Sequence, residues 1–82
     1  MPRYFFNVHD GVERPDPVGT VLPDLEAAKI EAILVTGQLL RAFAKQSLAG
    51  EDWRLNVTDD QGLVLFRLDV AVTTAPASLH HM

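Results

Sequence analysis

The sequence predicts a single α+β domain, a four-stranded sheet with one long helix packed on one face. Three observations indicate this class: a strand hairpin near the N-terminus, a helical segment from Leu25 to about Leu48, and a second strand pair after Asp52. The order is therefore β-β-α-β-β, a layout that β-grasp domains share. The 82 residues suffice for one domain. We expect it to span residues 1–72, with a mobile tail over 73–82.

The first hairpin is indicated by a short aromatic and β-branched segment. Arg3–Val8 is this segment and is expected to form the first strand. The following Asp10-Gly11 suits a tight turn. Pro15 and Pro17 each lack a backbone donor, so the returning strand, expected at about Val18–Leu22, belongs at an edge. The side chains expected to face the core are Tyr4, Phe6 and Val8.

The helix has recognisable signals at both ends. Asp24 is a good N-cap, and Glu26 suits the positive end of the helix dipole. Only Gly37 interrupts a run of helix-compatible residues, and Gly50 supplies a stop. We therefore expect an unusually long helix for a chain of this size.

The last two strands follow the helix. Trp53–Thr58 alternates with one buried face, Asp59–Gly62 is a turn, and Leu63–Val72 is the final strand. The residues of that strand expected to share one face are Val64, Phe66, Leu68 and Val70. Because the first and last strands contain no proline, we expect them to pair in the middle of the sheet.

The helix carries more apolar surface than one sheet can cover. At 100° per residue, one stripe suits the sheet. It consists of Leu25, Ala28, Ala32, Val35, Leu39 and Phe43. A second stripe lies beside it and consists of Ile30, Ile33, Leu34, Gly37, Leu40 and Ala44. A helix on a sheet normally keeps its far side polar, so this helix calls for a second apolar neighbour.

Two explanations of the second stripe remain open. The Asp10–Pro17 loop or the C-terminal tail could fold over it. Alternatively it is a protein interface, in which Gly37 allows another helix to come close. We favour the interface, formed by Ile30, Ile33, Leu34, Gly37 and Leu40. A homodimer is the simplest form, because twofold dimers dominate small oligomers; docking on another protein is the other.

Composition narrows the function classes. Hydrophobic residues make up 48% and charged residues 22% of the chain, as in ordinary globular domains. The chain has no cysteine, which excludes disulfides and thiolate metal sites. No apolar run approaches the roughly 20 residues that cross a bilayer, so we expect no membrane contact. The opening residues lack the zones of a signal peptide and the chain has no cysteine, so we expect a cytoplasmic location. The net charge of −4 opposes binding to phosphate backbones.

One surface nevertheless fits a nucleic-acid-binding reading. Basic and aromatic residues on an open sheet bind single strands by charge and stacking. The candidates on the outer face are Arg3, Phe5, Arg54 and Arg67. Asp69 on the same face and the acidic balance argue against this role, and arginines on a solvated strand are common.

We find no catalytic or cofactor-binding constellation in the sequence. His9, Asp10 and Glu13 lie in an acidic loop, where an acid–base pair can be imagined, but a solvated loop is favoured. His80 and His81 fall in the expected tail and lack further metal ligands. We therefore expect no enzyme activity, no cofactor and no metal.

Three segments resemble a family of short bacterial proteins classed only as a domain of unknown function. They are the opening Met1–Gly11, the Gly19–Ala32 stretch containing Leu-Pro-Asp-Leu-Glu-Ala-Ala, and Trp53–Phe66. The resemblance covers roughly residues 2–70 and implies a free-standing domain without an assigned activity. Ile30 and Leu34 depart from the smaller or charged residues expected of the family.

The function predicted from these observations is a non-catalytic protein-interaction module. The alternative is a nucleic-acid-binding or antitoxin-like regulator, since a helix after a hairpin also resembles the layout of small antitoxin domains.

Overall fold

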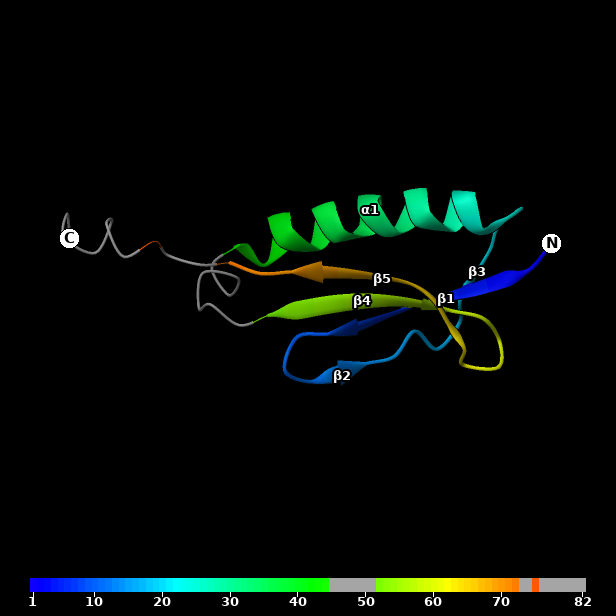
Figure 1. Cartoon of the computed structure of the whole chain (residues 1–82), viewed down its shortest axis with the longest axis horizontal. Coiled ribbons are helices and arrows are strands. Elements are labelled where there is room, and N and C mark those ends of the chain that lie inside the picture. The colour runs from blue at the N-terminus through cyan, green and yellow to red at the C-terminus, as the bar shows by residue number, and fades with distance from the viewer. Residues whose placement is uncertain (45–51, 73–74, 76–82) are drawn as a thin grey trace.

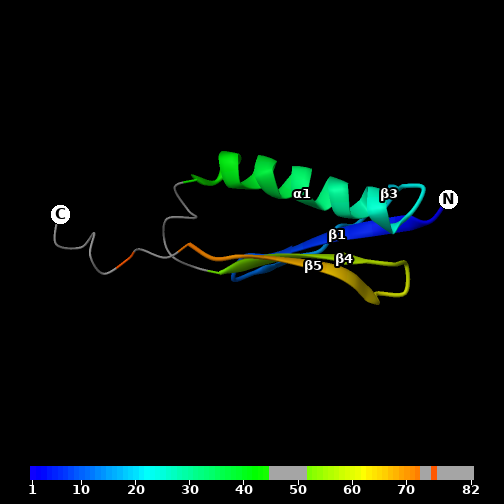
Figure 2. The same cartoon turned by 45° about the horizontal axis from the view of Figure 1, so that its top comes forward.

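A computed structural model describes residues 1–44, 52–72 and 75 and places one helix against one face of an antiparallel sheet (Figures 1 and 2). The elements are β1 (Arg3–His9), β2 (Glu13–Arg14), β3 (Thr20–Val21), α1 (Leu25–Ala42), β4 (Trp53–Thr58) and β5 (Val64–Val70). The predicted α+β class is confirmed. The sheet contains five strands rather than four, because the returning strand of the first hairpin is split. The expected tail lies outside the described residues, apart from Ala75.

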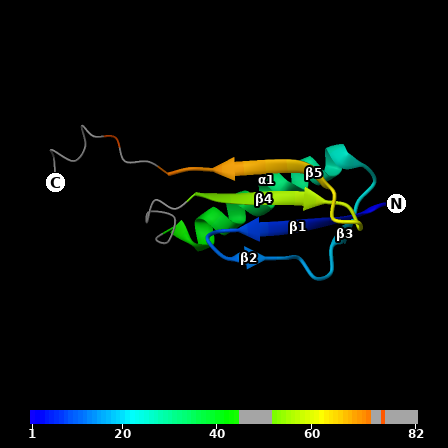
Figure 3. The ribbon, with the colours of Figure 1, turned by 60° about the horizontal axis from the view of Figure 1, so that its bottom comes forward.

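The strand order is β2-β1-β4-β5, and β3 also pairs with β1 (Figure 3). The prediction that the first and last strands meet in the middle is wrong. The tight turn between β4 and β5 makes them neighbours, and β4, with Phe5 opposite Thr58 and His9 opposite Arg54, takes the place beside β1. β5 is therefore an edge strand, and the β-grasp order is absent.

Asp16 explains why the returning strand is split. Flanked by Pro15 and Pro17, it accepts the Phe6 N–H at Oδ2 (3.2 Å) and the Val18 and Gly19 N–H groups at Oδ1 (3.1 and 3.0 Å). Its own N–H donates to Asn7 Oδ1 (2.8 Å). A side chain thus fills the gap in the β1 ladder that two prolines leave between β2 and β3.

Replacing Asp16 with asparagine should lower the free energy of unfolding by about 1–2 kcal/mol near neutral pH, because the amide loses the charge that these N–H groups favour. Partial burial alone would raise the pKa of Asp16, but the N–H groups of Gly19, Phe6 and Val18 outweigh it and hold the pKa below its ordinary 3.8. The unfolded chain then binds the proton more readily. The stabilisation is therefore complete above that ordinary pKa and disappears as the pH falls through the lowered one.

Urea titrations at several pH values test this prediction. The gap in stability between wild type and Asp16→Asn should narrow as the solution becomes more acidic than pH 3.8. A gap that stays constant from neutral to strongly acidic pH would show that the Asp16 charge is not what stabilises the fold.

The core lies between α1 and the inner face of the sheet. Its buried side chains are Tyr4, Ala28, Ala32, Leu55 and Val57. Phe6 and Val8 pack against this cluster, so the predicted inward face of β1 is confirmed. The small side chains of Ala28 and Ala32 let the helix come close to the strands. Because this side of α1 faces the sheet, the opposite side points away from it.

The helix begins where predicted, and α1 as described ends at Ala42. Asp24 caps it, with its Oδ1 accepting the Ala27 N–H at 2.9 Å. α1 ends at Ala42, because Phe43 leaves the helical conformation (φ −116°, ψ 35°). The remainder of the predicted helix, residues 45–48, lies outside the described residues. The predicted stop at Gly50 lies outside the described residues. Phe43 is 51% exposed, so it does not extend the core-facing stripe as expected.

A β-bulge corrects the predicted inner face of β5. Phe66 pairs with Val57, but the next pair joins Thr58 to Val64, so Leu65 is the additional residue. Directly paired residues share a face, and Thr58 lies on the face opposite Val57. Val64 therefore turns to the outer face, where it is 50% exposed, and does not join Phe66 on the inner face.

Candidate protein interface on the far face of the helix

The side of α1 that points away from the sheet is apolar and is left exposed by the described residues. Ala28, Ala32 and Thr36, spaced by four residues, form the buried side of the helix. On the opposite side Ile30, Ile33 and Leu34 are 55, 58 and 57% exposed. No segment that the structure describes lies over this side (Figures 1 and 2). Small soluble domains rarely leave several large aliphatic side chains exposed together in one patch.

The predicted cover by the Asp10–Pro17 loop is excluded. That loop runs from the β1–β2 hairpin along the β1 edge of the sheet, on the side of the strands away from the far face of α1 (Figure 3). The other proposed cover, the C-terminal tail, lies outside the described residues. Of the five predicted interface residues, four are exposed, and Leu40 is half-buried at the flank of the patch.

Gly37 lies within this patch and has open space around it among the described residues. Beyond its own stretch of helix, a Cβ built on it would meet no described atom within 4 Å. Glycine in a helix costs about 1 kcal/mol relative to alanine, because it leaves the unfolded chain more freedom. An exposed helical glycine with open space around it is explained if another surface comes close at this point.

Charged residues stand at both ends of the patch. Glu26 is in the first turn of α1 and Arg41 in the last. Their spacing from Ile30 and Gly37, four residues each, puts both on the same helix face as the patch. Glu26 was predicted only to suit the helix dipole, but it also continues the stripe. The spacing of positions 26, 30, 33, 37 and 41 in the sequence indicates this. We call the residues Glu26, Ile30, Ile33, Leu34, Gly37 and Arg41 the far-face stripe.

Thr36 was also missed as a core-facing residue. It is 6% exposed, and its Oγ1 has no hydrogen-bond partner among the described atoms. Its spacing of four residues from Ala32, a predicted core-facing position, could have identified it.

The outer face of the sheet holds the residues expected for nucleic-acid binding, but they do not form a free basic patch. Arg3 donates from Nη1 to the Val18 carbonyl (3.0 Å), and Arg67 Nε donates to Asp69 Oδ2 (3.1 Å). Phe5 packs against Gly19 and is half-buried. Arg54 is exposed, and the cross-strand row through it also contains His9, Glu13 and Asp69.

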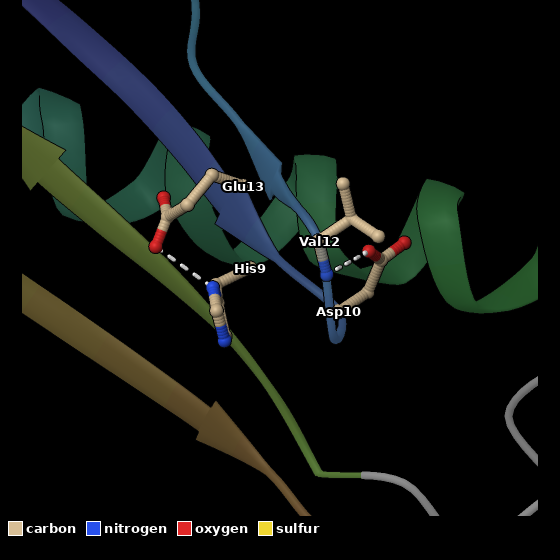
Figure 4. A network of polar contacts seen from close by, with 4 residues as sticks. All are labelled: His9, Asp10, Val12 and Glu13. Carbon is tan, nitrogen blue, oxygen red and sulfur yellow. Dashed lines mark hydrogen bonds and ion pairs between the residues drawn. The ribbon is translucent and has the colours of Figure 1, made fainter.

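The acidic hairpin loop makes bonds within itself (Figure 4). His9 Nδ1 lies 2.8 Å from Glu13 Oε1, and Asp10 Oδ1 accepts the Val12 N–H at 3.4 Å. Slight desolvation would raise the pKa of Asp10. However, the Arg14 guanidinium, which donates to Oδ2 at 3.0 Å, and the Val12 N–H lower it overall. These contacts give each group a structural role in the turn.

In the described ranges 1–44, 52–72 and 75, histidine, aspartate and glutamate side chains do not gather in threes that could hold a metal ion. In the same ranges, no helix combines the length and the hydropathy needed to cross a membrane.

Comparison with known proteins gives one finding. The model of a family described as "Domain of unknown function (DUF6894)" matches residues 3–71. Neither the curated proteins nor the solved structures give a match.

Proposed function

The chain belongs to the DUF6894 family of domains of unknown function, and we propose that it is a non-catalytic protein-interaction module that self-associates through the far-face stripe. The observation that carries the proposal is the row of three aliphatic side chains, each more than half exposed, on the far side of α1. Contiguous patches of this kind on small domains mark contacts with other proteins.

A second copy of the chain is the occupant that best fits the stripe. Charged residues of opposite sign bound it, Glu26 at one end and Arg41 at the other, so it complements itself. A domain of 82 residues also gains more than a large one from burying such a patch, because its own core is small. Twofold association is the commonest way to do this.

The non-catalytic part of the proposal is supported by what the titratable side chains do. Asp16 and Asp24 accept backbone N–H groups, and His9 contacts Glu13 within a hairpin. The nucleic-acid alternative is the weaker proposal, since Arg3 and Arg67 are already engaged and acidic residues share their face.

Replacing Leu34 with glutamate should break the self-association. A carboxylate buried at the interface without a partner weakens binding by roughly 2–4 kcal/mol, or about 30- to 1,000-fold. Light scattering should give about twice the chain mass of 9.1 kDa for the wild type and the single-chain mass for the variant. Circular dichroism should show unchanged secondary structure, because Leu34 is 57% exposed within the single chain.

Val12→Glu is the matched control. Val12 is 60% exposed, so the substitution adds the same charge to a similarly exposed apolar residue in the hairpin, away from α1. It should leave the assembled mass unchanged. The proposal fails if folded Leu34→Glu keeps the mass of the wild type, or if the wild type is itself a monomer at concentrations up to roughly 100 μM.

A further inference from the structure

We infer that two copies of the chain pair their α1 helices antiparallel, about a twofold axis that passes between Ile33 and Leu34. The inference rests on the proposed function and adds the arrangement of the two copies. It comes from a symmetry in the far-face stripe. Ile33 and Leu34 flank the midpoint, Ile30 and Gly37 are equally far from it, and so are Glu26 and Arg41.

An antiparallel twofold pair brings each of these residues onto its counterpart in the other copy. In such an interface, if one residue contacts a second, the second contacts the first across the axis. Ile33 of each copy then packs on Leu34 of the other, which buries both exposed side chains at the centre.

The next contact accounts for Gly37. Ile30 of one copy lies over Gly37 of the other, where no described atom beyond the glycine's own stretch of helix is within 4 Å of a built Cβ. The large side chain fills the space that the missing one leaves, so the helices can come close. A parallel pair would instead place glycine on glycine and isoleucine on isoleucine, with a void at one level and crowding at the other.

The charges at the ends favour the same direction. In the antiparallel pair Glu26 meets Arg41 of the other copy, and this happens twice. In a parallel pair like charges would meet at both ends. Each end lies about 11 Å along the helix from the axis, so both ion pairs form only if the helices cross at the shallow angle near 20°.

Cross-linking of introduced cysteines tests the arrangement, and the chain has no cysteine of its own to interfere. Two copies of Leu34→Cys lie beside the axis, so this variant should form a disulfide-linked dimer under mild oxidation. Ile30→Cys alone should not, because its two copies are displaced by about 10 Å along the helices, beyond disulfide reach. Gly37→Cys alone should fail for the same reason. A mixture of Ile30→Cys and Gly37→Cys, equilibrated before oxidation, should give the mixed disulfide.

Charge reversal supplies a second readout that needs no cysteine. Glu26→Arg and Arg41→Glu should each weaken the dimer by roughly threefold to tenfold, the range of two exposed ion pairs. Both substitutions in one chain should restore the wild-type affinity.

The possible results separate the two proposals. Self-linking of Leu34→Cys with the mixed 30–37 disulfide, and restoration in the charge-reversed double variant, support the antiparallel pair. If dimers form but Ile30→Cys and Gly37→Cys each link to themselves, self-association stands and the antiparallel arrangement is wrong. If light scattering finds only the monomer, both are wrong.

Discussion

Replacing Gly19 with alanine is expected to lower the free energy of unfolding by about 3 kcal/mol. Gly19 has a φ of +76°, a conformation that costs other residues about 1 kcal/mol or more. A Cβ at this position would lie 2.9 Å from the Tyr4 carbonyl oxygen and from carbon atoms of Arg3 and Phe5. The carbonyl belongs to β1 and cannot move away without disturbing its ladder, so overpacking adds about 1–3 kcal/mol.

Gly37→Ala is the matched control, because the same substitution should there have the opposite sign. Gly37 is helical and has open space around it, so alanine should stabilise the monomer by up to about 1 kcal/mol. Both substitutions are best compared in the Leu34→Glu background, where association does not contribute. Denaturant titration followed by fluorescence of Trp53, the only tryptophan, gives both values. Equal effects at the two glycines would contradict the described path of the chain at Gly19.

Leu55→Ala is expected to cost about 3–4 kcal/mol. Leu55 is fully buried in β4, between Val8 of β1 and Leu68 of β5, and faces the alanines of α1. Removing its side chain gives up its burial and leaves a cavity that the surrounding strands cannot close. A domain of this size has only a few kcal/mol of stability, so the variant should be partly unfolded at room temperature.

Leu63→Ala tests whether this loss comes from burial. Leu63 is 63% exposed in the β4–β5 turn, so the same substitution should change the free energy of unfolding by less than about 0.5 kcal/mol. A similar loss at the two leucines would mean that Leu55 does not lie at the centre of the core.

Local patterns predicted the parts of the fold that depend on local physics. Alternation identified β1 and β4 with the correct buried faces, and the carboxylate of Asp24 identified the start of α1. The strand order was wrong because it depends on which distant segments meet, and no local pattern records that β4 pairs with β1.

Other differences have a similar origin. The split of the returning strand depends on Asp16 reaching the Phe6 N–H ten residues away in the chain. The bulge that turns Val64 outward leaves no mark in the alternation of β5.

The candidate site was predictable in part. Helical spacing was sufficient to find the apolar patch around Leu34, because residues three or four apart share a face of any α-helix, whatever that helix packs against. The symmetric spacing of the stripe is also present in the sequence, in positions 26, 30, 33, 37 and 41. The structure adds that Glu26 and Arg41 are exposed and that no described atom beyond its own stretch of helix lies near a Cβ built on Gly37.

The two lateral edges of the sheet differ in a way that limits how copies can assemble through strands. On the β1 side, the two-residue strands β2 and β3 and the Asp16 carboxylate leave only short, interrupted edges. On the other side, β5 pairs with β4 along one edge, and none of the described strands pairs with its outer edge. Among the described strands, β5 therefore offers the one long edge to which a strand of another chain can pair. Two copies joined edge to edge at β5 would leave only the short β2 and β3 edges among the described strands, which disfavours further strand addition.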